Sequence, residues 1–285
     1  EEGSRFPSAN FWGSRAITGA IAPDDPQTTH GYDGESIAEA MRAVGLEPER
    51  ILEAERDDLD AFVELHIEQG PILEQSGLPV GIVNAITGIR HYVVELGGTA
   101  NHAGAFPMDL RRDPMAGAAE IISGVVATAH RMGRPAVTTV GRVVVEPNGP
   151  AIVPEAVTFT VDARHPDPAA RDALYAKHEA LMREVAARRD LEICWHHTFD
   201  QAPLTCDPAL VRLLEEAAAN QGVPTLTMAS GAVHDTQRMA ARCRVAMLFV
   251  RSKDGRSHTP AEFSSLEDCV AGIEVLAAAL HALAY

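Results

Sequence analysis

The sequence predicts an α/β fold in which one domain is split in sequence by a smaller inserted α+β domain. One observation is a pair of strand-like runs at residues 61–67 and 245–250, which flank a region with a different pattern. Another is that region itself, where the predicted order β-α-β-β-α-β is the split βαβ arrangement. The third is size, because 285 residues with 46% hydrophobic content suffice for one large domain or two medium ones. The expected division is 1–85, 86–203 and 204–285.

The first part begins with an irregular segment rich in Gly, Pro and Asp. Residues 36–44 then have the pattern of a short helix. Residues 61–67 (AFVELHI) alternate apolar and polar side chains over part of their length, which is typical of a strand. His66 comes at the end of this strand, a usual place for functional groups in an α/β sheet.

The second part combines β-branched, strand-like runs with two helical stretches. The predicted elements are a strand at 90–96, an Ala-rich helix at 113–130, strands at 136–145 and 156–163, a helix at 168–188 and a strand at 191–198. Residues 147–150 (PNGP) connect the two central strands. We expect these elements to form a compact two-layer domain.

The third part returns to the character of the first. Residues 207–221 have helical spacing, and residues 245–250 (VAMLFV) have the composition of a buried strand. Residues 266–285 predict a closing amphipathic helix.

Charge and cysteine content restrict the class of protein. The formal net charge of −16 argues against a nucleic-acid partner and against docking on an anionic membrane. The four cysteines show no C-x-x-C spacing, which suits a reducing compartment better than a disulfide framework. No apolar stretch is long enough to span a bilayer, and no signal peptide is recognised. We therefore expect a cytoplasmic protein.

An acidic pair and two widely separated histidines provide the materials of a zinc hydrolase. They are Glu1 and Glu2, followed by His66 and His258. One carboxylate can bind the metal while its neighbour takes a proton from metal-bound water. Taken singly, each has a plainer interpretation: adjacent carboxylates are common on surfaces, a strand histidine is often packed in a core, and a loop histidine is often solvated.

Three other positions are candidates for contact with a ligand. His102 lies among small residues, which leave room for a ligand but also suit a tight turn. His234 follows a glycine-containing turn. Arg164 ends a predicted strand and is suited either to a surface salt bridge or to a carboxylate clamp. The joint appearance of all these residues in distinct, locally structured contexts favours a site.

Six segments, in this order, resemble the hydantoinase/carbamoylase family of metal-dependent amidohydrolases: EEGSRF, ELHIEQGPILE, NHAGAFPMDLRRDP, VTFTVDARHPD, SGAVHD and KDGRSHTPAEF. That family includes N-carbamoyl-L-amino-acid hydrolases, β-ureidopropionases and allantoate amidohydrolases. The resemblance covers essentially the whole chain. It implies a zinc-peptidase-like catalytic domain, split around an inserted lid and dimerisation domain.

The resemblance also implies a role for each matching residue. Glu1 matches the general base, while Glu2 and His258 match ligands of one metal and His66 a ligand of the other. Residues that match substrate contacts are Gln69, His102, Arg164 and His234. Of these, His102 is expected to stabilise the oxyanion as a hydrogen-bond donor. The family's equivalents of His102 and Arg164 come from a partner subunit, so the implied assembly is a homodimer with two divalent ions (Zn, Mn or Co) in each complete site.

The implied reaction is hydrolysis of a linear C–N bond in a carboxylate-bearing substrate, with an N-carbamoyl-L-amino acid as the first choice. The alternatives are an allantoate amidohydrolase, a peptidase of the same superfamily and a non-catalytic truncated homologue. The family's upstream metal motif is expected before Glu1, so the chain is expected to lack its N-terminal segment. Two positions also depart from the family pattern, with Ala151 in place of Asn and Val233 in place of Gly. Ala151 cannot make the side-chain hydrogen bond to the substrate that Asn makes in the family. Val233 is larger than Gly and is expected to reduce the space in the pocket.

Overall fold

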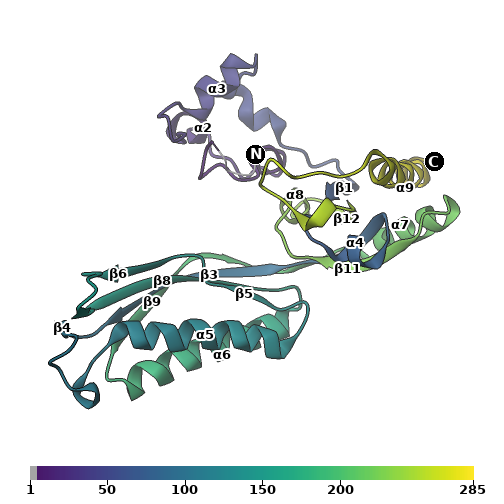
Figure 1. Cartoon of the computed structure of the whole chain (residues 1–285). Helices are drawn as coiled ribbons and strands as arrows, with labels where there is room; N and C mark the ends of the chain where they lie inside the picture. Colours follow the sequence, from purple (N-terminus) through teal and green to yellow (C-terminus); the bar gives the residue numbers. More distant parts are fainter. Residues whose placement is uncertain (1–4) are drawn as a thin grey trace. The chain divides into compact units, whose positions relative to one another are not determined.

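The computed structural model describes residues 5–285 and divides the chain into two compact units (Figure 1). The first unit takes the residues up to Ile86 together with Thr205–Tyr285, and the second takes Thr87–Leu204. Each unit is built around a sheet and has its own hydrophobic core.

The sheet of the first unit consists of β1 (Ala61–Ile67), β12 (Arg244–Val250), β2 (Val80–Ile86), β10 (Leu204–Thr205) and β11 (Thr225–Ser230). The strand order is β1-β12-β2-β10, with β11 also paired to β2. Strands β1 and β12 run parallel, with His66 opposite Phe249. Their carboxyl ends therefore lie at the same edge of the sheet, where the segments after both strands begin.

Successive side chains of β1 point to opposite faces of the sheet, so apolar and polar residues separate. Val63 and Leu65 pack toward the core that α7 (Pro208–Asn220) and α9 (Leu266–Ala284) form with the sheet. The intervening polar residues consequently point to the other face. The short helix α8 (Asp235–Met239) also contacts β1 and β12.

The remaining short elements of the first unit are α1 (Trp12–Ile17), α2 (Asp25–Thr28), α3 (Ile37–Ala43), η1 (Pro48–Ala54), α4 (Ile72–Ser76) and η3 (Lys253–Gly255). The helix predicted over residues 36–44 is present as α3. Its start follows from a capping box, because the Ser36 hydroxyl accepts from the Glu39 N–H and the Glu39 carboxylate accepts from the Ser36 N–H.

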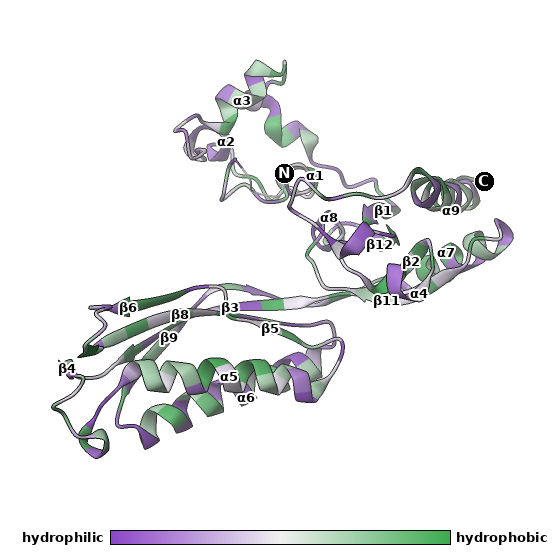
Figure 2. Ribbon diagram, viewed as in Figure 1, coloured by the Kyte–Doolittle hydropathy of each residue, from purple (hydrophilic) through white to green (hydrophobic). Residues whose placement is uncertain are grey.

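The second unit is an antiparallel sheet covered on one face by two long helices, α5 (Pro114–Met132) and α6 (Pro168–Arg188) (Figure 1). Its strands are β3 (Gly88–Gly97), β5 (Val137–Thr139), β6 (Val143–Glu146), β8 (Ala156–His165) and β9 (Glu192–Gln201). The order is β5-β8-β3-β9, with β6 also on β8. Hydrophobic residues run along α5 in Figure 2. Ile121 and Val125 of α5 belong to the same buried core cluster as Phe159 of β8. A separate two-stranded ribbon joins β4 (Asn101–His102) to β7 (Ile152–Val153), and η2 (Met108–Leu110) follows β4.

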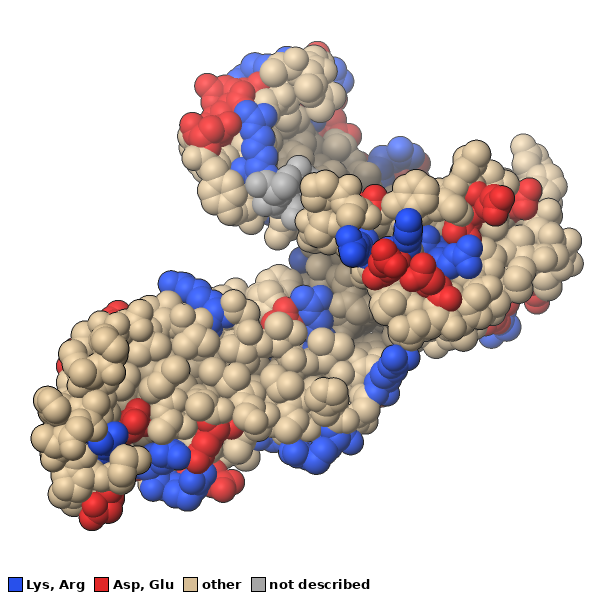
Figure 3. Space-filling model, in the orientation of Figure 1, with Lys and Arg blue, Asp and Glu red and all other residues tan. Residues whose placement is uncertain are grey.

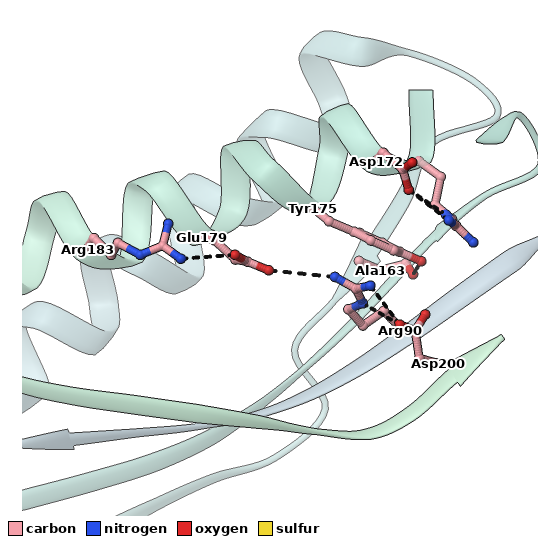
Figure 4. Close-up of polar contacts among 8 residues, drawn as sticks. Arg90, Ala163, Asp172, Tyr175, Glu179, Arg183 and Asp200 are labelled. Atoms are coloured by element: carbon pink, nitrogen blue, oxygen red, sulfur yellow. Dashed lines mark hydrogen bonds and ion pairs between the residues drawn. The ribbon is translucent and has the colours of Figure 1, made fainter. Parts of the chain in front are cut away.

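An arginine-centred network fastens α6 to the sheet of the second unit (Figure 4). The guanidinium of Arg90 lies 4.4 Å from the ring centroid of Tyr175 and donates to Asp200. It also pairs with Glu179 at 3.6 Å, and the Tyr175 hydroxyl donates to the Ala163 carbonyl at 3.2 Å. The network joins three strands to one helix, so it holds the two layers together.

Charged side chains of both signs are interspersed on the face shown in Figure 3. Many of them pair locally, as Arg171 does with Asp172 and Arg56 with Asp58. Water screens pairs at the surface, so they do not explain the fold.

Two details differ from the sequence-based prediction. The single strand expected over residues 136–145 is wrong, since β5 and β6 pair separately with β8. Strands β2 and β11 were not predicted. Strand β2 (VGIVNAI) contains Gly81 and Asn84, two residue types that are depleted in strands, so its apolar run is interrupted. Among the described helices, none combines the length and the apolar content that crossing a bilayer requires.

Candidate active site

Three potential ligand groups converge in the first unit: the carboxylate of Glu64 and the imidazoles of His66 and His234. Their ligand atoms all lie within 4.8 Å of one another. Glu64 and His66 are two residues apart on β1, so the strand directs both side chains to the same face. His234 is the N-cap residue of α8, and its ring meets the ring of His66 edge-on at 4.8 Å between centroids.

Burial sets the protonation states of this cluster. His234 is 2% exposed, and burial together with the neighbouring His66 lowers the pKa of its imidazole to about 3. It is therefore neutral at physiological pH, which is the form that binds metals. Burial raises the pKa of Glu64, although hydrogen bonds from Thr236 oppose that rise.

Hydrogen bonds hold each of the three side chains in place. His66 Nδ1 is 2.8 Å from the Ile67 carbonyl, which can only accept, so Nδ1 carries a hydrogen, and in the neutral ring Nε2 has the lone pair. Glu64 Oε2 accepts from the backbone N–H of Thr236 at 2.9 Å and from its hydroxyl at 2.5 Å.

His234 is oriented in the same way. Its Nε2 lies 2.7 Å from Ser230 Oγ, whose hydroxyl donates to the Ala232 carbonyl. Nε2 is therefore the donor of this ring, and Nδ1, 3.8 Å from Glu64 Oε1, has the lone pair. Outer hydrogen bonds of this type fix the ligating nitrogen of histidines in metal sites.

The donor set fits a divalent cation such as Zn²⁺. Carboxylate oxygen and neutral imidazole nitrogen are its usual ligands, at about 2.0–2.2 Å from the ion. Two ligands of a tetrahedral ion are therefore about 3.4 Å apart, so the observed spread of 4.8 Å needs a closure of about 1.4 Å. A cation would also neutralise the buried carboxylate of Glu64.

Gln69 and His258 follow β1 and β12, and their loops meet. Gln69 Nε2 donates to Ser257 Oγ at 3.0 Å, and the backbone N–H of His258 donates to the Glu262 carboxylate at 3.1 Å. Hydrogen bonds from the Ser257 hydroxyl and the His258 N–H lower the pKa of Glu262. Gln69 and His258 both have left-handed backbones, with φ of 57° and 56°. Such conformations are costly for non-glycine residues and are concentrated at functional sites.

The structure thus brings His66 and His234 together, while the described metal-type cluster does not include His258. Glu1 and Glu2 lie outside the described residues. The pairing of Glu2 with His258, and the role of Glu1 as general base, stay predictions. Sequence reasoning missed Glu64, although its spacing of two residues from His66 on a predicted strand was available as a signal.

The other two predicted residues belong to the second unit. His102 lies on β4 and is exposed. Arg164 lies on β8, where its Nε and Nη2 donate to the two oxygens of Asp162 at 2.8 and 2.7 Å. Burial alone would raise the pKa of Asp162, but hydrogen bonds from Arg164 and His91 outweigh it and lower the pKa to about 2. Asp162 therefore fixes the plane of the guanidinium, and the carboxylate clamp stays a prediction.

Comparisons with known proteins agree with these features. A family model described as "Peptidase family M20/M25/M40" matches residues 1–282. The N-carbamoyl-L-amino acid amidohydrolase of Geobacillus stearothermophilus is 42% identical over 278 residues, which are 97% of this chain and 67% of that protein. The allantoate amidohydrolase of Escherichia coli K12 is 41% identical over 285 residues, which are 100% of this chain and 69% of that protein. A hydantoinase/carbamoylase family amidase from Burkholderia multivorans superposes with a TM-score of 0.89 at 34% identity, covering 98% of this chain and 67% of that one. The resemblance and the fold class expected from the sequence are confirmed.

Proposed function

We propose that this chain, which belongs to peptidase family M20/M25/M40, takes part in the metal-dependent hydrolysis of a ureido C–N bond. The observation that supports this function best is the convergence of Glu64, His66 and His234. One neutral imidazole, a second imidazole whose Nδ1 faces a carbonyl, and one partly buried carboxylate form a donor set that suits a metal ion better than a packed core. Relatives at 41–42% identity are amidohydrolases, which supports the same chemistry.

The preferred substrate is an N-carbamoyl-L-amino acid, the compound class named for the Geobacillus relative. Allantoate is the second candidate, and the 41% identity to the Escherichia coli enzyme favours it. Both substrates contain a carbamoyl group and a carboxylate. One architecture can therefore serve both, provided that it polarises the first group and binds the second.

His66 and Glu64 would hold a divalent cation through Nε2 and Oε1. His234, which the resemblance assigned to the substrate, would add Nδ1 as a third ligand in this proposal. Such an ion polarises a carbonyl oxygen and lowers the pKa of water. We propose two ions for each complete site, chosen from Zn, Mn and Co, with Glu2 and His258 at the second position. Glu1 takes a proton from the attacking water and passes it to the leaving nitrogen.

Substrate contacts complete the proposal. Gln69 lies in the loop after β1, close to the loop of His258. Arg164 holds the substrate carboxylate, and its planar fork is suited to this because it can present two parallel N–H groups. His102 donates a hydrogen bond to the developing oxyanion. We propose that His102 and Arg164 act across a homodimer. We also propose a cytoplasmic location, which suits the four free cysteines.

Two measurements on the native protein that contains this chain test the proposal. The first is ammonia release from a panel of N-carbamoyl-L-amino acids and from allantoate, before and after chelation and reloading with Zn²⁺, Mn²⁺ or Co²⁺. We expect turnover only in the metal-loaded protein. Hydrolysis of neither substrate class would overturn the proposed substrates.

The second measurement is calorimetric titration of Zn²⁺ into the metal-free protein. Losing a residue that only supports a metal ligand weakens metal binding about 10- to 100-fold. His66 is itself a proposed ligand, so His66→Ala should weaken Zn²⁺ binding by more than that. The matched control is His196→Ala, because His196 is an exposed histidine on β9 of the second unit. Unchanged affinity in His66→Ala would show that the cluster is not the metal site.

A further inference from the structure

We propose that Arg111 is a positioning residue that holds His102 in the tautomer with its hydrogen on Nε2. The inference rests on the proposed function in one respect only, namely that His102 contacts the substrate. It concerns the turn at residues 103–106, directly after β4. The sequence pattern alone gives no sign that Arg111 contacts this turn.

The first observation is the environment of His102 Nδ1. This nitrogen accepts hydrogen bonds from the backbone N–H groups of Gly104 at 3.1 Å and Ala105 at 3.0 Å. Backbone N–H groups only donate, so Nδ1 must present its lone pair to both. In the neutral ring the hydrogen is then on Nε2, which makes Nε2 a hydrogen-bond donor.

The second observation is how the turn is held. Arg111 Nη2 donates to the Ala103 carbonyl at 2.5 Å and to the Phe106 carbonyl at 2.9 Å, and its Nε donates to Phe106 at 3.2 Å. The two peptide N–H groups that face His102 lie between these carbonyls in the chain. By binding both ends of the turn, Arg111 fixes the direction of the N–H groups in the middle.

The turn is also tied down from outside, through main-chain groups alone. The Ala103 N–H donates to the Ala151 carbonyl at 3.0 Å, and β4 pairs with β7. Position 151 has Ala where the family has Asn, but its carbonyl still accepts this hydrogen bond because the contact uses the main chain. The Phe106 N–H also closes the turn on the His102 carbonyl at 3.3 Å. Arg111 adds side-chain hydrogen bonds to the carbonyls at both ends.

An arginine is needed at this position because the guanidinium offers several N–H donors in a rigid plane, whereas a lysine offers a single flexible ammonium. Its neighbour Arg112 has a different task. Arg112 Nε donates to the Asp190 carbonyl at 2.6 Å, and the guanidinium pairs with the carboxylates of Asp190 and Glu192. Arg112 is consequently a matched control, with the same charge and the same unit but different contacts.

The tautomer decides whether His102 Nε2 stabilises or repels the negative charge that develops on the substrate. A donor at Nε2 stabilises negative charge on the carbonyl oxygen under attack, while the other tautomer would present a lone pair to that charge. Removing a single oxyanion donor in other hydrolases costs about 100- to 1000-fold in kcat. Because the loss of Arg111 only frees the tautomer to vary, a smaller effect of about 10- to 100-fold is expected.

The test is the tautomer of His102, measured by NMR on the full chain with ¹⁵N-labelled histidine and assigned with His102→Gln. In the unmodified chain, long-range ¹⁵N–¹H correlations should show a protonated Nε2 and an unprotonated Nδ1. Arg111→Ala should give a mixture of tautomers, Arg111→Lys a partial one, and Arg112→Ala the unmodified pattern. A protonated Nδ1 in the unmodified chain, or an unchanged tautomer in both Arg111 variants, would overturn the proposal. If Arg111→Ala does not fold, Arg111→Lys decides the outcome.

Turnover by the native protein separates this inference from the proposed function. Arg111→Ala should lower kcat by about 10- to 100-fold with little change in KM, and Arg111→Lys should recover part of it. Absence of any turnover in the unmodified protein would remove the proposed function, while the NMR result would still decide the tautomer. An equal loss in the Arg112 variant would show that Arg111 acts only through general stability.

Discussion

Each unit of this protein contains a partly buried carboxylate on a strand, with a second polar residue two positions further along. In the first unit the pair is Glu64 and His66, and in the second it is Asp162 and Arg164. The pKa of Glu64 is raised, whereas the pKa of Asp162 is lowered to about 2. Burial acts upward on both groups, so it does not cause the difference.

The difference lies in the charge that faces each carboxylate. Asp162 accepts two hydrogen bonds from the guanidinium of Arg164, so its negative charge is compensated within the chain. Glu64 accepts from the neutral amide and hydroxyl of Thr236 and faces the neutral imidazole of His234. The same spacing on a strand therefore gives two different results. In the second unit Arg164 neutralises Asp162, whereas in the first unit no described Lys or Arg pairs with Glu64, whose cluster suits a metal ion.

The largest expected effect in the second unit comes from a buried histidine, and it sharpens this comparison. His178 is fully buried, and Thr138 Oγ1 lies 2.9 Å from its Nε2. Burial lowers its pKa from 6.5 to about 4. The unfolded chain therefore takes up a proton at a higher pH than the folded chain does. The contribution of His178 to the stability of the second unit should be constant above about pH 6.5, fall by about 3 kcal/mol between pH 6.5 and 4, and level off below that.

Urea unfolding at a series of pH values measures this dependence. The chain has two tryptophans, so a Trp12→Phe background makes the fluorescence report on Trp195 of the second unit. In His178→Gln the fall assigned to this residue should disappear. An unchanged pH profile in that variant would assign the acid sensitivity to other groups.

The next largest effect is expected from neutralising the two carboxylates one at a time. The result can contradict the proposed difference between the two units. Asp162→Asn leaves the guanidinium of Arg164 without its compensating charge. The lowered pKa corresponds to about 2 kcal/mol of stabilisation at neutral pH, which this variant should lose. Glu64→Gln in the metal-free chain removes a desolvated charge and should change the free energy of unfolding by less than about 1 kcal/mol.

Chemical denaturation of both variants at pH 7, in the presence of a chelator, provides these values. Equal losses would mean that the two carboxylates are compensated alike, and the contrast between the units would fail. Adding Zn²⁺ should then stabilise the unmodified chain but not Glu64→Gln.

The smallest expected effect concerns a neutral hydrogen bond of the second unit. Tyr175→Phe removes the hydroxyl that donates to Ala163 but leaves the ring on which Arg90 stacks. We expect a loss of about 1 kcal/mol, the usual value for one intramolecular hydrogen bond. Tyr32→Phe is the control, since Tyr32 is 81% exposed and should cost nothing measurable. A loss near 3 kcal/mol would show that the hydroxyl, rather than the stacked ring, organises the network.

Local chemistry in the sequence accounts for much of the fold. Helices α5, α6 and α7 each begin with Asp-Pro, in which the aspartate caps the helix and the proline takes its first position. The periodicity of residues 61–67 and 156–163 was sufficient to predict β1 and β8. Strand β2 escaped prediction although the equally buried β12 did not, because Gly81 and Asn84 interrupt the apolar run of β2.

The site divides in the same way. The sequence by itself determined that His66 ends a strand and that His234 follows a turn, because both depend on neighbouring residues alone. Only the tertiary structure decided that Glu64, His66 and His234 meet, since closure of the first unit brings together segments about 170 residues apart. It also decided that Arg164 faces its own Asp162 and that Arg111 supports the turn of His102. The physical reason is that hydrogen bonds and burial depend on which groups approach in space, whereas periodicity and capping depend only on the order of residues along the chain.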